Sequence, residues 1–233
     1  MRLCLIALAL SCAALPALSA DSLPQATARS FPVPQAAIMA REHAPVNTCA
    51  ALQEAYVAGG WPRGAGVETL KQIDSRVKQR MTLKNDPGVD TWTPLSAAIL
   101  SGKRPSGDCD DLSVTTAQFA ICAGMPADRL GLLITESPNR GSGELHMLAF
   151  YSDASDRTWV FGDTFGRPRA LSKVNQRLLF FARMDHVTKW YALIGRDNAP
   201  VTSAVPDATA SIPLLPETPR YGSCSGSWAQ NGG

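Results

Sequence analysis

Apolar positions in the first half of the chain follow the period of an α-helix. Over residues 67–81 they recur every third or fourth position, which predicts an amphipathic helix with one apolar face. Shorter helices are predicted over residues 48–57, where Thr48 can cap the first turn, and over residues 94–100, which open with a proline. Residues 85–88 read Asn-Asp-Pro-Gly and indicate a turn.

A further helix is predicted immediately after residues 107 and 108. One of its faces carries Leu112, Thr116, Phe119 and Ala123. Gly124 stands where a left-handed C-terminal cap belongs, and Pro126 prevents the helix from continuing. This pattern places Cys109 in the first turn of a buried helix.

Beyond this helix the apolar pattern alternates with period two, which is typical of strands. Five strands are predicted, over residues 129–135, 144–151, 158–164, 178–184 and 189–194. Helices followed by strands indicate an α+β domain in which N-terminal helices pack on an antiparallel sheet.

The second and third of these strands form a predicted hairpin around a polar loop, residues 152–157. If the strands pair symmetrically about that loop, Tyr151 lies opposite Thr158 and His146 lies opposite Asp163. Directly opposed side chains share a sheet face, with Cβ atoms about 5 Å apart. The pattern therefore predicts contact between His146 and Asp163, provided that no bulge shifts the register.

The two ends of the chain lack the pattern of a folded core. Residues 1–20 combine a basic start, an apolar run and small residues, which predicts a secretory signal peptide. Lipoprotein processing at Cys12 and an ordinary buried N-terminal helix are the alternatives for this segment. Proline-rich residues 21–46 predict an extended arm, and Pro/Gly/Ser-rich residues 197–233 predict a disordered tail. A single folded domain is then expected over residues 47–196.

The composition indicates which classes of binding partner to expect. The 233-residue chain is 45% hydrophobic and 18% charged, an ordinary globular balance. Its net charge is +2 and no basic block stands out, so we expect no binding to nucleic acid. No segment after the signal is long and apolar enough to predict a membrane span. The signal peptide predicts a periplasmic or secreted protein.

Removal of the signal would leave four cysteines for an oxidising compartment: Cys49, Cys109, Cys122 and Cys224. If one of them is a catalytic thiol, the other three form at most one bridge. Cys122 follows Cys109 by thirteen positions, about 20 Å along a helix, so these two cannot be bridged. We predict a Cys49–Cys224 disulfide because both residues lie outside the predicted helix–sheet core.

Cys109 is a candidate nucleophile because a helix start stabilises a thiolate through its dipole and unpaired amides. A lone cysteine is more often a small buried hydrophobe, so the hypothesis depends on a base. His43 and His186 lie in predicted arm and loop segments, which leaves His146 as the histidine within a strand. A carboxylate beside His146 would hold one tautomer and leave the other nitrogen to take a proton from sulfur. The same His146–Asp163 contact is equally compatible with a structural hydrogen bond.

Four short motifs occur in order along the chain: Trp92-Thr93-Pro94-Leu95, Gly107-Asp108-Cys109-Asp110-Asp111, Leu145-His146-Met147 and Gly162-Asp163. Together they resemble the bacterial transglutaminase-like cysteine peptidases, the family that includes the LapG-type periplasmic proteases. The similarity covers roughly residues 67–195. It implies a papain- or transglutaminase-like fold, with Cys109 as nucleophile, His146 as base and then acid, and Asp163 orienting the histidine.

The resemblance also implies a metal. LapG-type members bind calcium through acidic residues beside the cysteine, which here are Asp108 and Asp110, and calcium favours such oxygen ligands. Asp110 stands where that family usually has a glutamate, and Thr164 follows the triad aspartate where an asparagine is typical. The alternative for the acidic residues is that Asp108 caps the helix while Asp110 and Asp111 complement its positive end.

The implied function is an exported cysteine endopeptidase that cleaves a protein substrate through a thioester acyl-enzyme, with possible calcium dependence. A surface adhesin is the substrate that the resemblance implies. A transglutaminase or an amidase would use the same three residues, and a catalytically silent binding module would keep the same fold, so these stay as alternatives.

Overall fold

The computed structural model describes residues 21–193, except residues 25, 44–45, 87–89, 137–144 and 165. The predicted signal peptide (residues 1–20) and tail (residues 197–233) lie outside the described residues, as does part of the predicted turn at 85–88. The domain boundaries at 47 and 196 therefore stay a prediction. Among the helices that the structure describes, none is long and apolar enough to cross a membrane.

A six-stranded sheet with antiparallel pairing throughout forms one half of the fold. Its order is β6-β5-β4-β3-β7-β8. The strands are β3 (Leu130–Glu136), β4 (Leu145–Ser152), β5 (Thr158–Phe161), β6 (Arg169–Ala170), β7 (Leu178–Arg183) and β8 (Tyr191–Ala192). The two central strands, β3 and β4, are buried on both faces, which is why they read as nearly continuous apolar runs.

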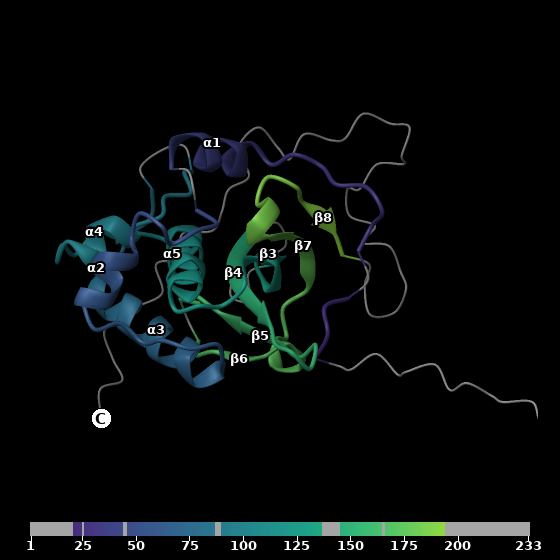
Figure 1. Ribbon diagram of the computed structural model, residues 1–233. Coiled ribbons are helices and arrows are strands. Elements are labelled where there is room, and N and C mark those ends of the chain that lie inside the picture. The colour runs from purple at the N-terminus through teal and green to yellow at the C-terminus, as the bar shows by residue number, and fades with distance from the viewer. Residues whose placement is uncertain are drawn as a thin grey trace, which may run out of the picture.

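Helices that precede the sheet in sequence cover one of its faces. The bounds of this layer are α2 (Gln53–Ala58), α3 (Val67–Arg80), α4 (Ser96–Leu100) and α5 (Cys109–Cys122). α5 packs on β3 and β4, α2 and α4 lie on the far side of α5, and α3 packs on α5 and also contacts β5 (Figure 1). Because α5 lies between two layers, every one of its residues except Ile121 is buried. The predicted α+β class, with N-terminal helices packed on an antiparallel sheet, is confirmed.

Short elements join these layers and cover the other sheet face. A parallel pair, β1 (Thr82–Leu83) and β2 (Ser106–Gly107), leads the chain into α5. Three single-turn helices lie in the connections: η1 (Ala127–Arg129) joins α5 to β3, whereas η2 (Leu171–Lys173) and η3 (Met184–His186) lie between strands. Buried side chains of η2 and of the sheet form a second apolar cluster behind β4 and β5. The sheet is therefore covered on both sides.

The N-terminal arm is not extended throughout, contrary to the prediction from its prolines. α1 (Pro34–Glu42) begins with proline at its first position, where the missing N–H has no helical partner to lose. Ala36 and Met39 are buried in the core, and an isolated bridge joins Phe31 to Trp190. Here proline marks the start of a helix that packs on the domain.

The β4–β5 hairpin is paired one residue away from the predicted register. Ser152 lies opposite Thr158 and Tyr151 opposite Trp159, so the predicted pairing of Tyr151 with Thr158 is wrong. Ser152 is the last residue of β4, and its hydroxyl lies 3.1 Å from that of Thr158 on the partner strand. The loop begins at Asp153, whose carboxylate accepts two backbone N–H groups from within the loop. The loop is thus held by the Asp153 side chain, and the strands pair in a register that symmetry about the loop centre did not predict.

The predicted Cys49–Cys224 disulfide is also wrong. Cys49 is bonded to Cys122, with Cα atoms 4.9 Å apart, and Cys224 lies outside the described residues. Cys122 ends α5, where the segment around α2 packs, and the rings of Tyr56 and Phe119 lie 5.6 Å apart there. The bridge therefore joins two neighbouring parts of the helical layer, and Cys109 keeps a reduced thiol.

Candidate active site

Cys109 is the first residue of α5 and only 1% exposed. The chain enters the helix through Asp108, whose backbone is extended (φ −109°, ψ −150°), immediately after the β1–β2 pair. The first turn of a helix leaves backbone N–H groups without helical partners and concentrates the positive end of the helix dipole. The sulfur atom therefore lies where an anion is stabilised.

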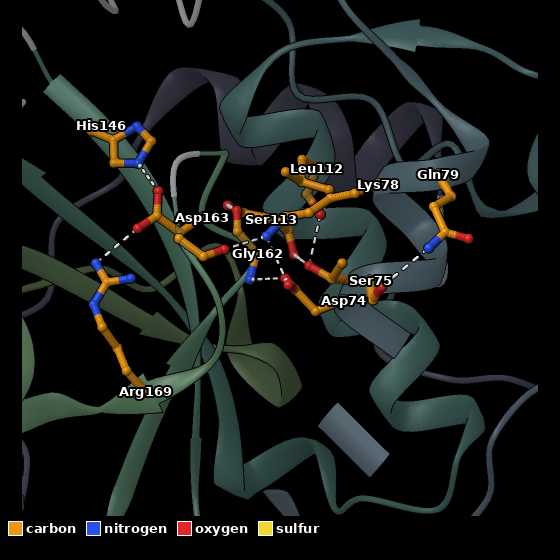
Figure 2. Close-up of polar contacts among 12 residues, drawn as sticks. Asp74, Ser75, Lys78, Gln79, Leu112, Ser113, His146, Gly162, Asp163 and Arg169 are labelled. Atoms are coloured by element: carbon orange, nitrogen blue, oxygen red, sulfur yellow. Dashed lines mark hydrogen bonds and ion pairs between the residues drawn. The ribbon is translucent and has the colours of Figure 1, made fainter. Parts of the chain in front are cut away.

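His146 reaches this site from β4 and joins the cysteine to Asp163. Its Nε2 lies 3.1 Å from Asp163 Oδ1, and both side chains are buried (Figure 2). The predicted contact between the two is confirmed. Burial opposes a charged ring, but hydrogen bonds to Asp163 and Cys109 outweigh it and raise the pKa of His146 from 6.5 to about 9. Since Nε2 faces Asp163, Nδ1 is the ring nitrogen left for the thiol.

Asp163 reaches His146 by a route that the strand pattern did not predict. β5 ends at Phe161, and Gly162 adopts a left-handed backbone conformation (φ +68°) that bends the chain out of the strand. The second carboxylate oxygen, Oδ2, lies 2.8 Å from Arg169 Nη2, in the edge strand β6 (Figure 2). Both oxygens of Asp163 are thus paired, one with the candidate base and one with a guanidinium.

Ser113, one turn after Cys109, contacts α5, β4 and the segment that follows β5. Its Oγ lies 2.7 Å from the carbonyl oxygen of Cys109, 3.0 Å from that of Met147 and 3.2 Å from that of Gly162. The last two carbonyls belong to the neighbours of His146 and Asp163 in sequence. One hydroxyl proton can serve one of these acceptors at a time, so Ser113 acts as a shared contact at the centre of the site.

Acidic side chains surround the cysteine on the other side. One candidate ligand atom each from Asp108, Cys109 and Asp110 lies within 4.8 Å of the other two, and all three residues are buried. Within the described residues, neither carboxylate oxygen of Asp110 has a hydrogen-bond donor, nor does Oδ1 of Asp108. Burial, and then the neighbouring Asp108, raises the pKa of Asp110 well above its ordinary value. Buried carboxylates without donors are unusual and suit a cation.

The helix-capping alternative fits Asp111 better than the predicted metal ligands. Asp111 Oδ1 accepts the backbone N–H of Thr93 at 2.6 Å, and its carboxylate also accepts the backbone N–H of Asp108. Burial nevertheless raises the pKa of Asp111 to about 8. Asp108 itself makes no side-chain capping bond. These backbone contacts account for the Asp111 carboxylate and leave the Asp108 and Asp110 carboxylates unexplained.

Sequence reasoning missed Asp90, a further member of this acidic cluster. Burial first, and then the charge of Asp108, raises the pKa of Asp90 to about 7, and Asp90 in turn raises the pKa of Asp110. Asp90 lies eighteen positions before Asp108, in a connection without periodic pattern, so no sequence signal placed it here. Arg169 was missed for the same reason. By contrast His43 and His186 are exposed, as expected for histidines outside the site.

Comparisons with known proteins find similar solved structures but no matching family or curated protein. No protein-family model and no curated protein matches the sequence. Two solved structures of LapG from Legionella pneumophila, one calcium-bound and one EGTA-treated, are each 16% identical to this chain, with TM-scores of 0.44 and 0.43. Each comparison covers 66% of this chain and 84% of LapG. What this site can do chemically is therefore argued from this chain's own side chains.

Proposed function

We propose that this chain is an exported cysteine endopeptidase in which Cys109 is the nucleophile, His146 the base and Asp163 the residue that orients the base. The single observation that carries the proposal is the contact of His146 with both partners, through Nε2 to Asp163 and through its other side to the Cys109 thiol. A thiol at a helix start, a histidine and a carboxylate in this order are the parts that thiol-dependent acyl transfer requires.

The first half of the reaction forms a thioester. His146 Nδ1 takes the thiol proton, and the Cys109 sulfur attacks the carbonyl carbon of a peptide bond. The carbonyl oxygen becomes an oxyanion, which the backbone N–H of Cys109 at the helix start is placed to bind. When the C–N bond breaks, the imidazolium gives its proton to the departing amine.

The second half releases the acid product. His146 removes a proton from water, the hydroxide attacks the thioester carbon, and the C–S bond breaks to return the Cys109 sulfur. Asp163 stabilises the imidazolium in both halves, and Arg169 fixes the other oxygen of Asp163 so that Oδ1 keeps facing the ring. The raised pKa of His146, about 9, favours an imidazolium beside a thiolate at neutral pH.

Calcium is part of the proposal, with Asp108 and Asp110 as the residues that would hold it. The donor set fits, because the carboxylate oxygens of Asp110 lack donors and hard oxygen ligands are those that calcium prefers. A bound divalent cation would neutralise carboxylates that otherwise repel one another and the thiolate. The ordering of the first turn of α5 would follow from this neutralisation.

Export is supported by the disulfide between Cys49 and Cys122, since structural disulfides persist in oxidising compartments.

The substrate that we propose is a protein rather than a small amide. A peptide library made from an exported bacterial proteome, incubated with the purified protein and calcium, tests this proposal by the new N-termini that appear. We expect cleavage by the wild-type protein and none by Cys109→Ala.

Three outcomes of this experiment have different meanings. Cleavage that survives in Cys109→Ala would exclude Cys109 as the nucleophile. Absence of new termini, together with incorporation of a dansylated amine into glutamine peptides, would favour a transglutaminase. Absence of both activities would favour a binding module that has kept the fold.

A further inference from the structure

A second ion pair lies directly behind the Asp163 segment, here defined as residues 162–164 and 166. Asp74 and Lys78 are one turn apart on α3, and Lys78 Nζ lies 2.7 Å from Asp74 Oδ2. Their side chains are 3% and 15% exposed, respectively. Burying such a pair carries a desolvation penalty, so a buried ion pair is weak evidence for a purely stabilising role.

Each member of the pair also holds one glycine of the Asp163 segment. Asp74 Oδ1 accepts the backbone N–H of Gly162 at 2.9 Å, on the N-terminal side of Asp163 (Figure 2). Lys78 Nζ donates to the carbonyl oxygen of Gly166 at 2.5 Å, on the C-terminal side. The two anchoring points therefore bracket the residue that contacts His146.

Both glycines occupy positions where their backbone decides the direction of Asp163. Gly162 has a left-handed conformation (φ +68°), which turns the chain after β5 and which other residues adopt at a cost. A Cβ atom on Gly166 would lie 2.9 Å from Asp163 Oδ2 and would also collide with the Arg169 guanidinium. Gly166 thus leaves the space in which Asp163 and Arg169 meet.

We propose that the Asp74–Lys78 ion pair of α3 is a two-point anchor that positions Asp163 for its contact with His146. Neither residue touches the reacting atoms, so both are positioning residues. The inference rests on the proposed function for its catalytic meaning, whereas the geometric effect on His146 can be measured without any substrate.

The matched pair Glu68–Lys71 on the same helix offers a control. Lys71 Nζ lies 2.6 Å from Glu68 Oε1, but both side chains are exposed and bond to no part of the site that is described. The test variant is Asp74→Leu/Lys78→Met, which removes the whole pair and leaves no unpaired buried charge. The control variant is Glu68→Leu/Lys71→Met. Lys78→Arg is the conservative variant, which retains a cation able to reach both acceptors.

The first readout is the ring N–H proton of His146, followed by NMR in protein labelled with ¹⁵N-histidine. The chain has three histidines, and His43 and His186 are exposed, so the hydrogen-bonded Nε2–H of His146 is the one protected from water. We expect a downfield resonance in the wild type, in the control and in Lys78→Arg. In the test variant this resonance should shift upfield or disappear.

The second readout is turnover of a peptide selected from the library. We expect kcat to fall between about tenfold and a hundredfold in the test variant, with KM unchanged, because misorientation of the base affects the chemical step. Lys78→Arg should keep kcat close to the wild-type value. If the double variant does not fold, Lys78→Met compared with Lys78→Arg answers the same question at one position.

An unchanged His146 resonance in a folded test variant would overturn the anchor, whatever happens to kcat. A lost resonance in the Glu68/Lys71 control would overturn it as well, since any change on α3 would then have the same effect. If the wild type cleaves no peptide, the proposed function fails, and the resonance alone decides whether the pair positions Asp163.

Discussion

The two sides of this site satisfy their charges in opposite ways. Around Asp163, both carboxylate oxygens are paired, one with His146 and the other with Arg169. Around Cys109, both oxygens of Asp110 and one of Asp108 have no hydrogen-bond donor within the described part of the chain. All of these carboxylates are buried, so the difference lies in their partners and not in their exposure.

This difference separates two roles. The Asp163 side is complete in the protein alone, as a fixed support for a base should be. The Cys109 side carries buried and half-buried carboxylates whose pKa values are raised, by burial first and also by neighbouring carboxylates. Such a cluster binds protons or a cation to become stable. The comparison therefore predicts that the nucleophile side responds to calcium and the base side does not.

The largest effect is expected from replacing His146, the residue that joins Asp163 to Cys109. His146→Gln should lower kcat/KM for a library-selected peptide by about a thousandfold, because a general base contributes in this range. His186→Gln, at an exposed histidine, is the control and should behave as wild type. A His146→Gln protein that keeps most of its activity would exclude His146 as the base.

A second effect should separate Asp110 from an ordinary capping residue. Calcium at a hundred times its Kd should raise the free energy of unfolding by about 2.7 kcal/mol at pH 8, and magnesium should substitute poorly. Asp110→Asn should abolish this gain and, without calcium, should be more stable than wild type because asparagine is neutral where burial disfavours an ionised carboxylate. Thermal melts with calcium, magnesium or a chelator measure both effects.

Asp156→Asn supplies the matched control for the calcium experiment. Asp156 is exposed and has a left-handed backbone (φ 56°) that asparagine also tolerates. The control should keep the full calcium response. No response to calcium in the wild type, with Asp110→Asn neutral, would leave Asp108 and Asp110 as helix-terminus charges without a metal.

The third prediction concerns pH and His146, whose pKa depends on both Asp163 and Cys109. The pKa of His146 is raised in the folded protein from 6.5 to about 9, so the folded state binds the proton more tightly than the unfolded state. The resulting stability is fully present below pH 6.5 and is lost as pH rises through about 9. Urea unfolding of wild type and His146→Gln should show a stability difference that shrinks over this window. A difference that grows with pH would have the wrong sign.

The smallest effect is expected at Ser113, which both sides share. Ser113→Ala should cost about 1 kcal/mol of stability, the usual net value of one hydrogen bond, with a modest loss of activity. Ser96→Ala is a stringent control because the Ser96 hydroxyl is buried without a partner among the described residues. Equal stability losses in the two variants would show that the Ser113 contacts contribute nothing specific.

The helix that carries Cys109 was predictable because its signals are local. Periodic apolar positions, a glycine with positive φ at its end (Gly124, φ +105°) and a following proline all lie within one short segment. The His146–Asp163 contact was also predicted, but through a register that is wrong by one residue. Asp163 reaches His146 because Gly162 bends the chain, and alternation along a strand carries no information about such a bend.

Features that depend on tertiary packing were not predictable. Asp74, Asp90 and Arg169 join the site from segments far apart in sequence, and none belongs to a motif. The Cys49–Cys122 bridge depends on how α2 packs against the end of α5. Local patterns thus located the candidate reacting groups, whereas their support came from packing between elements.

Covalent labelling of Cys109 by a peptide vinyl sulfone tests the central claim most directly. Addition of the thiolate to this electrophile needs the same activated sulfur and neighbouring histidine as peptide cleavage, but it requires no knowledge of the natural substrate. We predict that peptide mapping by mass spectrometry finds the label on Cys109 of the folded wild type, much faster than on Cys109 of His146→Gln or of urea-unfolded protein. Equal labelling rates in these three samples would contradict the proposal that Cys109 is an activated nucleophile.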